Sequence, residues 1–360
     1  MAKSKDIQEL SYVNIKEYNE LLYHVMTTGD RLLVLGNPGI GKSQCVHEQA
    51  KKLDKEVCDI RLSQFLDGGD LVMKIPNADN TIINEIVFNR LPTKSNQILF
   101  IDEFSHADET VKKAMFELIH DRKLGPYRLP DGVPIIAAGN EGRDMMSSDI
   151  SSPLLDRFTF RVKLEPTLEE FNNYIKDKPN GMLIAGYLSA FKENMYVWPE
   201  HGRVLMTPRR WEKVSIYYTN QVLIKSIMPP GIYTGFEEFC KKVEMFRDVE
   251  AYINGKKKCP EDKGDQWAIY TACLSLLQNQ QPNKFEDMAF NILNEKFVDM
   301  DAEIQTAVVF DTLRTMKAKK GNSDSFAIDL IAKLSEPKKS IFKKVITRYQ
   351  FAVEGLQAQN

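Results

Sequence analysis

The chain has 360 residues, of which 43% are hydrophobic and 27% charged, and its formal net charge is −2. This length allows two or three domains with at least one large core, and the composition is that of a soluble globular protein. The near-neutral charge gives no overall reason to expect nucleic-acid binding. The sequence has neither a signal-peptide core nor a long apolar run, which predicts no membrane span and, by default, a cytoplasmic location.

The cysteines and histidines do not form a recognisable metal or disulfide pattern. The five cysteines are scattered without a C-x-x-C pair, which argues against a disulfide framework or a zinc site. The five histidines also lack metal-ligand spacing, so we expect each of them to be structural or exposed. These residues are Cys45, Cys58, Cys240, Cys259 and Cys273, with His24, His47, His106, His120 and His201.

The first predicted helix spans residues 14–27. Asn14 and Glu17 at its start resemble a capping box, with Asn in place of Ser or Thr. Its apolar side chains recur with helical spacing and give one apolar face: Tyr18, Leu21, Leu22, Val25 and Met26. Core packing is the expected role of this face, although a helix just ahead of the next motif could also border a nucleotide base.

Residues 36–43 fit the phosphate-loop pattern G-x-x-x-x-G-K-[ST] at every fixed position. The apolar residues 32–35 before it predict a buried parallel strand, and residues 44–53 can continue as a helix, which is the context that the motif requires. An ordinary Gly-rich turn is the alternative. Backbone N–H groups of such a loop surround phosphate oxygens, with Lys42 on the β- and γ-phosphates and Ser43 on Mg²⁺. The predicted nucleotide-binding residues are Gly36, Asn37, Pro38, Gly39, Ile40, Gly41, Lys42 and Ser43.

The segment between the second and third predicted strands is read as an insertion. A second strand is expected at residues 56–62. Residues 64–90 then lack a long periodic pattern and carry Gly68, Gly69 and Pro76. The apolar residues within 82–87 could form a short strand or hairpin, and a plain irregular crossover is the alternative.

The apolar residues 98–101 predict a central parallel strand that ends in Asp102 and Glu103. Ligands bind at the carboxyl ends of such strands. Asp102 is therefore expected to hold Mg²⁺ through water, and Glu103 to orient and deprotonate the water that attacks the γ-phosphate.

Further elements follow in the same alternation. A helix is predicted at residues 108–122, a turn or hairpin at 127–132, and a buried strand at 134–140 that ends in Asn140. The Asn140 amide could bond both the γ-phosphate and the lytic water, or simply form a turn after Gly139.

Four motifs stand in the order typical of an AAA+ ATPase. They are the phosphate loop, residues 101–104, residues 137–140 and residues 154–158 (Leu-Leu-Asp-Arg-Phe). The set most resembles the MoxR group of the helix-2-insert clade, and the insertion at residues 64–90 lies where that clade carries its insert. The resemblance covers roughly residues 14–165. It implies that Asn140 is sensor 1 and that Arg157 is an arginine finger acting in the neighbouring subunit's site. A surface arginine after a helix is the alternative for Arg157.

The chain is predicted to be helical from Glu165 onward. Residues 167–170 form a capping box, and residues 182–194 continue the helical pattern. Thr207 and Pro208 then predict a helix start with two arginines in its first turn, where they oppose the helix dipole. A nucleotide phosphate would explain them. The resemblance implies that Arg209 is sensor 2, with Arg210 as the other choice of register.

The last third of the chain is less informative. Helices are expected at residues 236–252 and 266–277, with a break at 229–231, and the lysines 256–258 are expected to be solvated. Ten basic side chains against three acidic ones between Arg314 and Arg348 could dock an acidic partner or nucleic acid, but a solvated helical face is favoured. No internal repeat is found.

The sequence therefore predicts an α/β P-loop NTPase core of AAA+ type with a parallel sheet (residues 1–163), a helical lid (164–228) and a helical C-terminal extension (229–360). The resemblance implies Mg²⁺-dependent ATP hydrolysis by a homo-oligomeric, hexameric ring that remodels a client protein. It also implies a partner with a von Willebrand factor A domain. ATP is chosen over GTP by resemblance alone. Two rivals are a nucleic-acid motor, against which the few basic residues of the insertion argue, and an ATP-binding switch or scaffold with negligible turnover.

Overall fold

The computed structural model describes residues 10–79, 81–140, 155–197, 206–246, 248, 251–252, 256–258, 260–279, 300–320, 339–340 and 343. Contacts between Cα atoms divide the chain into two units. One comprises Met1–Phe171 with Thr207–Arg209, and the other comprises Asn172–Met206 with Arg210–Asn360. In the described part of the chain, no helix is long and apolar enough to cross a membrane.

The first unit is built on a sheet of six strands, each parallel to its neighbours. Parallel strands place all their carboxyl ends at one edge, so this edge is where a ligand would be expected. The four strands predicted from apolar runs are confirmed, whereas the first and last along the chain were not predicted. In spatial order the strands are β1 (Ser11–Val13), β10 (Phe160–Leu164), β2 (Arg31–Gly36), β9 (Ile135–Asn140), β6 (Gln97–Asp102) and β3 (Glu56–Arg61).

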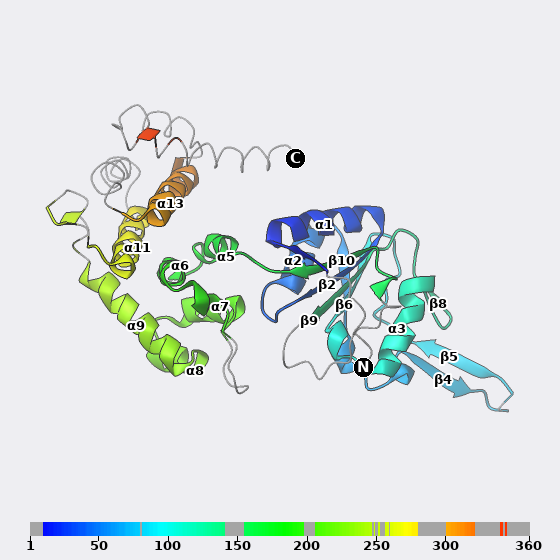
Figure 1. Ribbon diagram of the computed structural model, residues 1–360. Coiled ribbons are helices and arrows are strands. Elements are labelled where there is room, and N and C mark those ends of the chain that lie inside the picture. The colour runs from blue at the N-terminus through cyan, green and yellow to red at the C-terminus, as the bar shows by residue number, and fades with distance from the viewer. Residues whose placement is uncertain are drawn as a thin grey trace, which may run out of the picture. The chain divides into compact units, whose positions relative to one another are not determined.

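Helices cover both faces of this sheet (Figure 1). Helix α3 (Glu109–Asp121) buries Val111, Met115 and Leu118 in one core cluster with alternate residues of β2, β6 and β9. On the other face lie α1 (Ile15–Thr28) and α2 (Lys42–Lys52), whose His47 ring meets the Phe100 ring of β6 edge-on. Burial on both faces explains why the central strands read as continuous apolar runs.

The predicted capping of α1 is confirmed. Asn14 Oδ1 accepts from the Glu17 N–H, and the Glu17 carboxylate accepts from the Asn14 N–H, both at 2.9 Å. The helix ends at Gly29, whose φ of 78° is left-handed. A Cβ at Gly29 would lie 2.8 Å from the Gly132 carbonyl oxygen, so both the backbone angle and the space favour glycine here.

The insertion contains an antiparallel hairpin, β4 (Val72–Pro76) and β5 (Ile83–Val87), which confirms the hairpin interpretation. It follows two short 3₁₀ turns, Leu62–Gln64 and Gly68–Asp70, and extends away from the sheet (Figure 1). A second, smaller hairpin pairs β7 (Lys123–Leu124) with β8 (Tyr127–Arg128) and so begins earlier than the turn predicted at 127–132.

The second unit is helical in its described residues, as predicted. Its core is aromatic: the Tyr187 ring lies 5.6 Å from Trp211 and 5.2 Å from Phe236 between centroids, and all three side chains are buried. Gly186 lets two helices approach closely, because a Cβ there would lie 1.9 Å from Thr271 Oγ1. The helices are α5 (Leu168–Ile175), which starts in the first unit, α6 (Gly181–Ala190), α7 (Pro208–Tyr217), α8 (Gln221–Ile227), α9 (Pro230–Met245), α11 (Lys263–Asn279) and α13 (Ala302–Lys320).

Three boundaries differ from the predictions. Helix α6 stops at Ala190, and a 3₁₀ turn over Lys192–Met195 replaces the rest of the helix predicted at 182–194. Helix α9 starts at Pro230 rather than at residue 236, because proline suits the first helical position, and it ends at Met245. The predicted break at 229–231 is therefore the start of this helix.

Most of the basic stretch from 314 to 348 lies outside the described residues. Arg314 is described, and its guanidinium bonds Asn173 and the Asp177 carboxylate, the latter at 2.6 Å. The lysines 256–258 are exposed as expected.

Candidate nucleotide site

Lys42 is a buried cation at the start of α2, with only 7% of its surface exposed. Its Nζ donates to the carbonyl oxygens of Gly36 and Asn37 at 2.7 and 2.9 Å. The third acceptor is Asn140 Oδ1 at 3.0 Å. Burial lowers the pKa of Lys42 to about 8; Asp102 acts to raise it and Arg209 to lower it further. A cation held by neutral oxygens keeps its charge available for an anion.

The loop backbone has the conformation that the glycines allow. Gly39 and Gly41 have φ of 76° and 99°, which side-chain-bearing residues rarely adopt. A Cβ on Gly41 would meet no atom within 4 Å, whereas one on Gly39 would lie 2.9 Å from Thr207 Oγ1. Free space therefore borders the loop at Gly41, just before the helix N-terminus.

Ser43 and Asp102 lie side by side, as the sequence predicted for a magnesium site. The Ser43 hydroxyl donates to Asp102 Oδ2 at 2.8 Å, and Asp102 Oδ1 accepts from the Glu103 N–H at the same distance. A hydroxyl and a carboxylate are oxygen ligands of the kind that Mg²⁺ prefers. Their pairing brings the first turn of α2 to the carboxyl end of β6.

Glu103 follows β6 in a left-handed backbone conformation, with φ of 57°. This conformation is uncommon for residues other than glycine and marks sites where backbone strain serves a function. The Ser63 hydroxyl donates to Glu103 Oε2. Sequence reasoning did not single out Ser63; its signal is the register of β3 on β6, which pairs Arg61 with Asp102.

Asn140 ends β9 directly beside Gly36, the last residue of β2. Its side chain reaches Lys42, and its main-chain carbonyl accepts from the Ser105 hydroxyl at 3.0 Å. The structure therefore brings the predicted sensor residue to the predicted phosphate loop. Lys42, Ser43, Asp102 and Asn140 form one connected group at the carboxyl edge of the sheet.

Arg157 is not part of that group. Its guanidinium lies over the ring of Phe116 in α3, with Cζ 4.8 Å from the ring centroid. The next residue, Phe158, is buried in the core below the sheet. An arginine outside its own site is what the resemblance implies for a residue acting on a neighbouring subunit.

Arg209 lies next to the phosphate loop, and its N–H donates to the Gly39 carbonyl at 3.1 Å. Arg210 differs, because its guanidinium donates to the Ile227 carbonyl of the helical unit at 2.9 Å. Of the two arginines, Arg209 has the placement expected of a residue that contacts phosphate.

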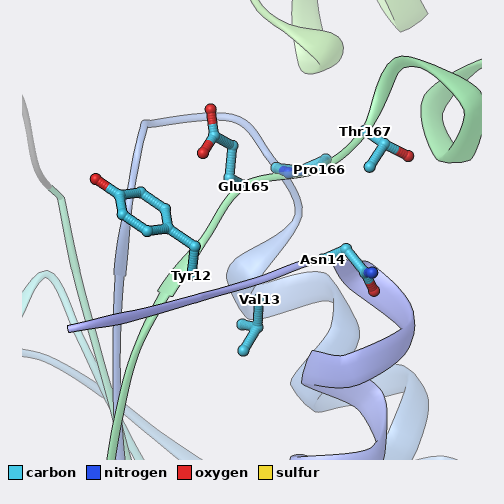
Figure 2. Close-up of a pocket in the computed structure, with 6 residues that line it drawn as sticks. All are labelled: Tyr12, Val13, Asn14, Glu165, Pro166 and Thr167. Atoms are coloured by element: carbon cyan, nitrogen blue, oxygen red, sulfur yellow. The ribbon is translucent and has the colours of Figure 1, made fainter.

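An open pocket of about 290 Å³ lies at the ends of β1 and β10 (Figure 2). Its wall includes Tyr12 and Glu165, whose side chains point to the same side, together with Asn14 and Pro166. Leu164, the residue before Glu165, approaches the start of the phosphate loop, because its carbonyl oxygen would lie 2.8 Å from a Cβ on Gly36.

Residues 31–158 match the family described as AAA domain (dynein-related subfamily). This segment is similar to AAA domains and is called the AAA domain from here on. The chain thus has the AAA+ P-loop fold that the sequence predicted, with its six-stranded parallel sheet between helices.

The sequence identity to individual proteins is low. An uncharacterised protein of Methanocaldococcus jannaschii is 22% identical over 258 residues, which are 71% of this chain and 66% of that relative, so the chain spans about two thirds of its length. Among solved structures, the Thermotoga maritima RuvB Holliday junction branch migration motor is 19% identical with a TM-score of 0.39, over 66% of this chain and 74% of that one. A RuvB variant from the same organism is 16% identical with a TM-score of 0.41, over 67% of this chain and 77% of that one.

The AAA domain fits both a polyphosphate and Mg²⁺. Within the described residues, every hydrogen bond of Lys42 Nζ goes to a neutral oxygen, so an anionic phosphate would supply the missing charge. Ser43 Oγ and Asp102 Oδ2 are already within 2.8 Å of each other and could share a cation. The residues present therefore suit a polyphosphate together with Mg²⁺.

Proposed function

We propose that this chain is a Mg²⁺-dependent ATPase of the MoxR type, which works as a homo-oligomeric ring and remodels a partner protein. The observation that carries the proposal is the buried Lys42 cation, whose hydrogen bonds in the described part of the chain go to neutral oxygens, next to the Ser43–Asp102 pair. The match of residues 31–158 to an AAA domain supports ATP as the substrate class.

Each residue of the AAA domain has a defined task in this proposal. Lys42 binds the β- and γ-phosphates, and the loop N–H groups orient them. Ser43 and Asp102 hold Mg²⁺, which neutralises phosphate charge when bound. Glu103 accepts a proton from the water that attacks the γ-phosphate in line, and Asn140 orients that water. Ser63 holds the Glu103 carboxylate before the substrate arrives.

The charge that develops on the γ-phosphate needs one more cation, which we assign to Arg157 of a neighbouring subunit. Arginine fingers are worth about 10³- to 10⁵-fold in turnover. Because Arg157 lies over Phe116 and outside its own Lys42 group, one subunit alone lacks this contribution. Turnover then requires an assembly, for which the MoxR resemblance suggests a hexamer.

Phosphate sensing by Arg209 would couple the site to the helical lid. Arg209 belongs to the first unit and donates its backbone N–H to the Gly39 carbonyl, whereas α7 from Arg210 onward belongs to the helical unit. Movement of the lid on hydrolysis would act on a client, for which a von Willebrand factor A domain protein is the candidate partner.

A protein client suits the β4–β5 hairpin better than nucleic acid does. Its exposed side chains include Met73, Ile83 and Ile86. Its lysine, Lys74, lies 3.7 Å from the Glu85 carboxylate, so the charges of this strand pair offset one another. Nucleic-acid binding draws its affinity from many unneutralised basic side chains.

The test of this proposal is ATP turnover against protein concentration, with Mg²⁺, for the parent, Glu103→Gln and Arg157→Ala. We expect specific activity to rise steeply with concentration in the parent. Both variants should bind nucleotide but lose turnover, by 100-fold or more, since each lacks one part of the transition-state machinery.

Equal turnover in the parent and in Glu103→Gln would refute catalysis by Glu103 and support the alternative of an ATP-binding switch. A turnover rate that depends neither on protein concentration nor on Arg157 would refute the ring assembly. Stimulation by DNA that falls steeply with salt would restore the nucleic-acid motor.

A further inference from the structure

Arg157 is held in an unusual way for a charged side chain. Its Cζ lies 4.8 Å from the centroid of the Phe116 ring, and both side chains are half-buried. The neighbouring carboxylate of Asp156 is instead engaged by Arg161 at 3.2 Å. Within the described ranges, no acidic side chain forms an ion pair with Arg157.

We infer that Phe116 is the positioning residue of Arg157 and holds the guanidinium ready for the neighbouring subunit's γ-phosphate. An aromatic ring attracts the charge of the guanidinium and brings no oxygen that would accept from its N–H groups. A carboxylate partner would occupy those same N–H groups. The aromatic ring thus restrains the arginine without competing with phosphate. This inference rests on the proposed role of Arg157 as a finger.

The main chain next to Arg157 is anchored by the buried side chain of Phe158. Phe158 is 2% exposed and meets the Phe104 ring edge-on, with 6.1 Å between centroids. Phe104 in turn directly follows Glu103. These contacts hold the backbone in place, and the ring of Phe116, which packs against the same core cluster, lies under the Arg157 guanidinium.

The expected effect is moderate. A partly exposed cation–π contact favours the held side-chain position by about two- to five-fold. Misplaced catalytic groups can lose more than this. We expect Phe116→Leu to lower turnover at saturating ATP by about five-fold and to leave KM unchanged, because nucleotide binding does not involve the finger. Phe116→Tyr keeps an aromatic face and should retain parental turnover.

The decisive experiment uses mixed assemblies of full-length Arg157→Ala and Glu103→Gln chains. Activity in the mixture comes from Arg157→Ala sites, which keep Glu103 and receive a finger from Glu103→Gln neighbours. Phe116→Leu added to the Glu103→Gln chain should reduce the recovered turnover about five-fold. The same substitution in the Arg157→Ala chain should have no effect, which makes it the matched control.

The outcomes separate this inference from the function on which it rests. No recovered activity in the starting mixture would refute the finger in trans, and the inference with it. Recovered activity that falls equally with Phe116→Leu in either chain, or that does not fall at all, would overturn the positioning role and leave the finger intact. A loss of turnover in Phe116→Tyr as large as in Phe116→Leu would also overturn it.

Discussion

Two lysines, one in each unit, are largely shielded from water but have opposite kinds of partner. Lys42 in the AAA domain is 7% exposed and bonds only neutral oxygens among the described residues. Lys176, at the end of α5 in the helical unit, lies 2.5 Å from the Asp311 carboxylate of α13. Tyr270 of α11 also donates to that carboxylate.

The difference separates a structural charge from a functional one. The Lys176 charge is neutralised by the protein itself, and the pair ties α5 to α11 and α13. The Lys42 charge is desolvated, and the favourable effect of nearby Asp102 does not offset this, so its pKa is lowered and the charge costs stability. A ligand that brought a counter-charge would relieve this cost, which agrees with the proposed role of Lys42 in phosphate binding, whereas the Lys176 pair has a structural role.

The largest expected effect is on nucleotide affinity. Lys42→Met removes the cation that meets the phosphates, and we expect affinity for MgATP to fall by about 1,000-fold, the scale of a charge-assisted contact that is lost from a buried site. Lys176→Met should change affinity less than three-fold. Titration of both variants with a fluorescent ATP analogue measures this. Retained tight binding in Lys42→Met would mean that the phosphate loop has been misassigned.

The second expected effect is on the stability of the fold, where substitution of Lys176 should matter more than substitution of Lys42. Lys176→Met leaves the Asp311 carboxylate buried without its cation, and loss of one partner of a buried pair costs about 3 kcal/mol or more. At pH 7 Lys42 is charged in the folded and the unfolded chain, so its lowered pKa of about 8 is a cost to folding that Lys42→Met removes.

Urea unfolding without nucleotide measures both variants. We expect Lys176→Met to unfold at lower urea than the parent, and Lys42→Met to unfold at equal or higher urea. Destabilisation by Lys42→Met would mean that its hydrogen bonds outweigh the desolvation of its charge, and the contrast between the two lysines would disappear.

Much of this site could be predicted from the sequence because its signals are local. The motif at residues 36–43 predicts its own loop conformation. The central strands are continuous apolar runs that end in Asp102 and Asn140. Parallel strands then bring those ends to one edge without further information. Identification of the AAA+ fold needed little more than the order of these motifs.

Contacts between distant segments could not be predicted in this way. Lys176 and Asp311 are 135 residues apart, and neither lies in a motif. The Ser63–Glu103 bond depends on the register of two strands, and the Arg157–Phe116 contact on where α3 packs. Strand β10 was missed although Phe160, Val162 and Leu164 alternate with charged residues, the signal of a half-buried strand.

The smallest expected effect is the pH dependence of nucleotide affinity. Below pH 8 the free AAA domain already carries a charged Lys42, and affinity should be constant. Above pH 8 the free lysine is neutral, and because bound phosphate favours the charged form, binding must take up a proton. Affinity should therefore fall about tenfold between pH 7 and pH 9, with proton uptake measurable by calorimetry in two buffers. Lys42→Arg cannot lose its proton in this range and is the matched control. If Lys42→Arg showed the same decline, the titrating group would lie elsewhere. If the affinity of the parent did not change, Lys42 would stay charged throughout this pH range, and the contrast with Lys176 would rest on geometry alone.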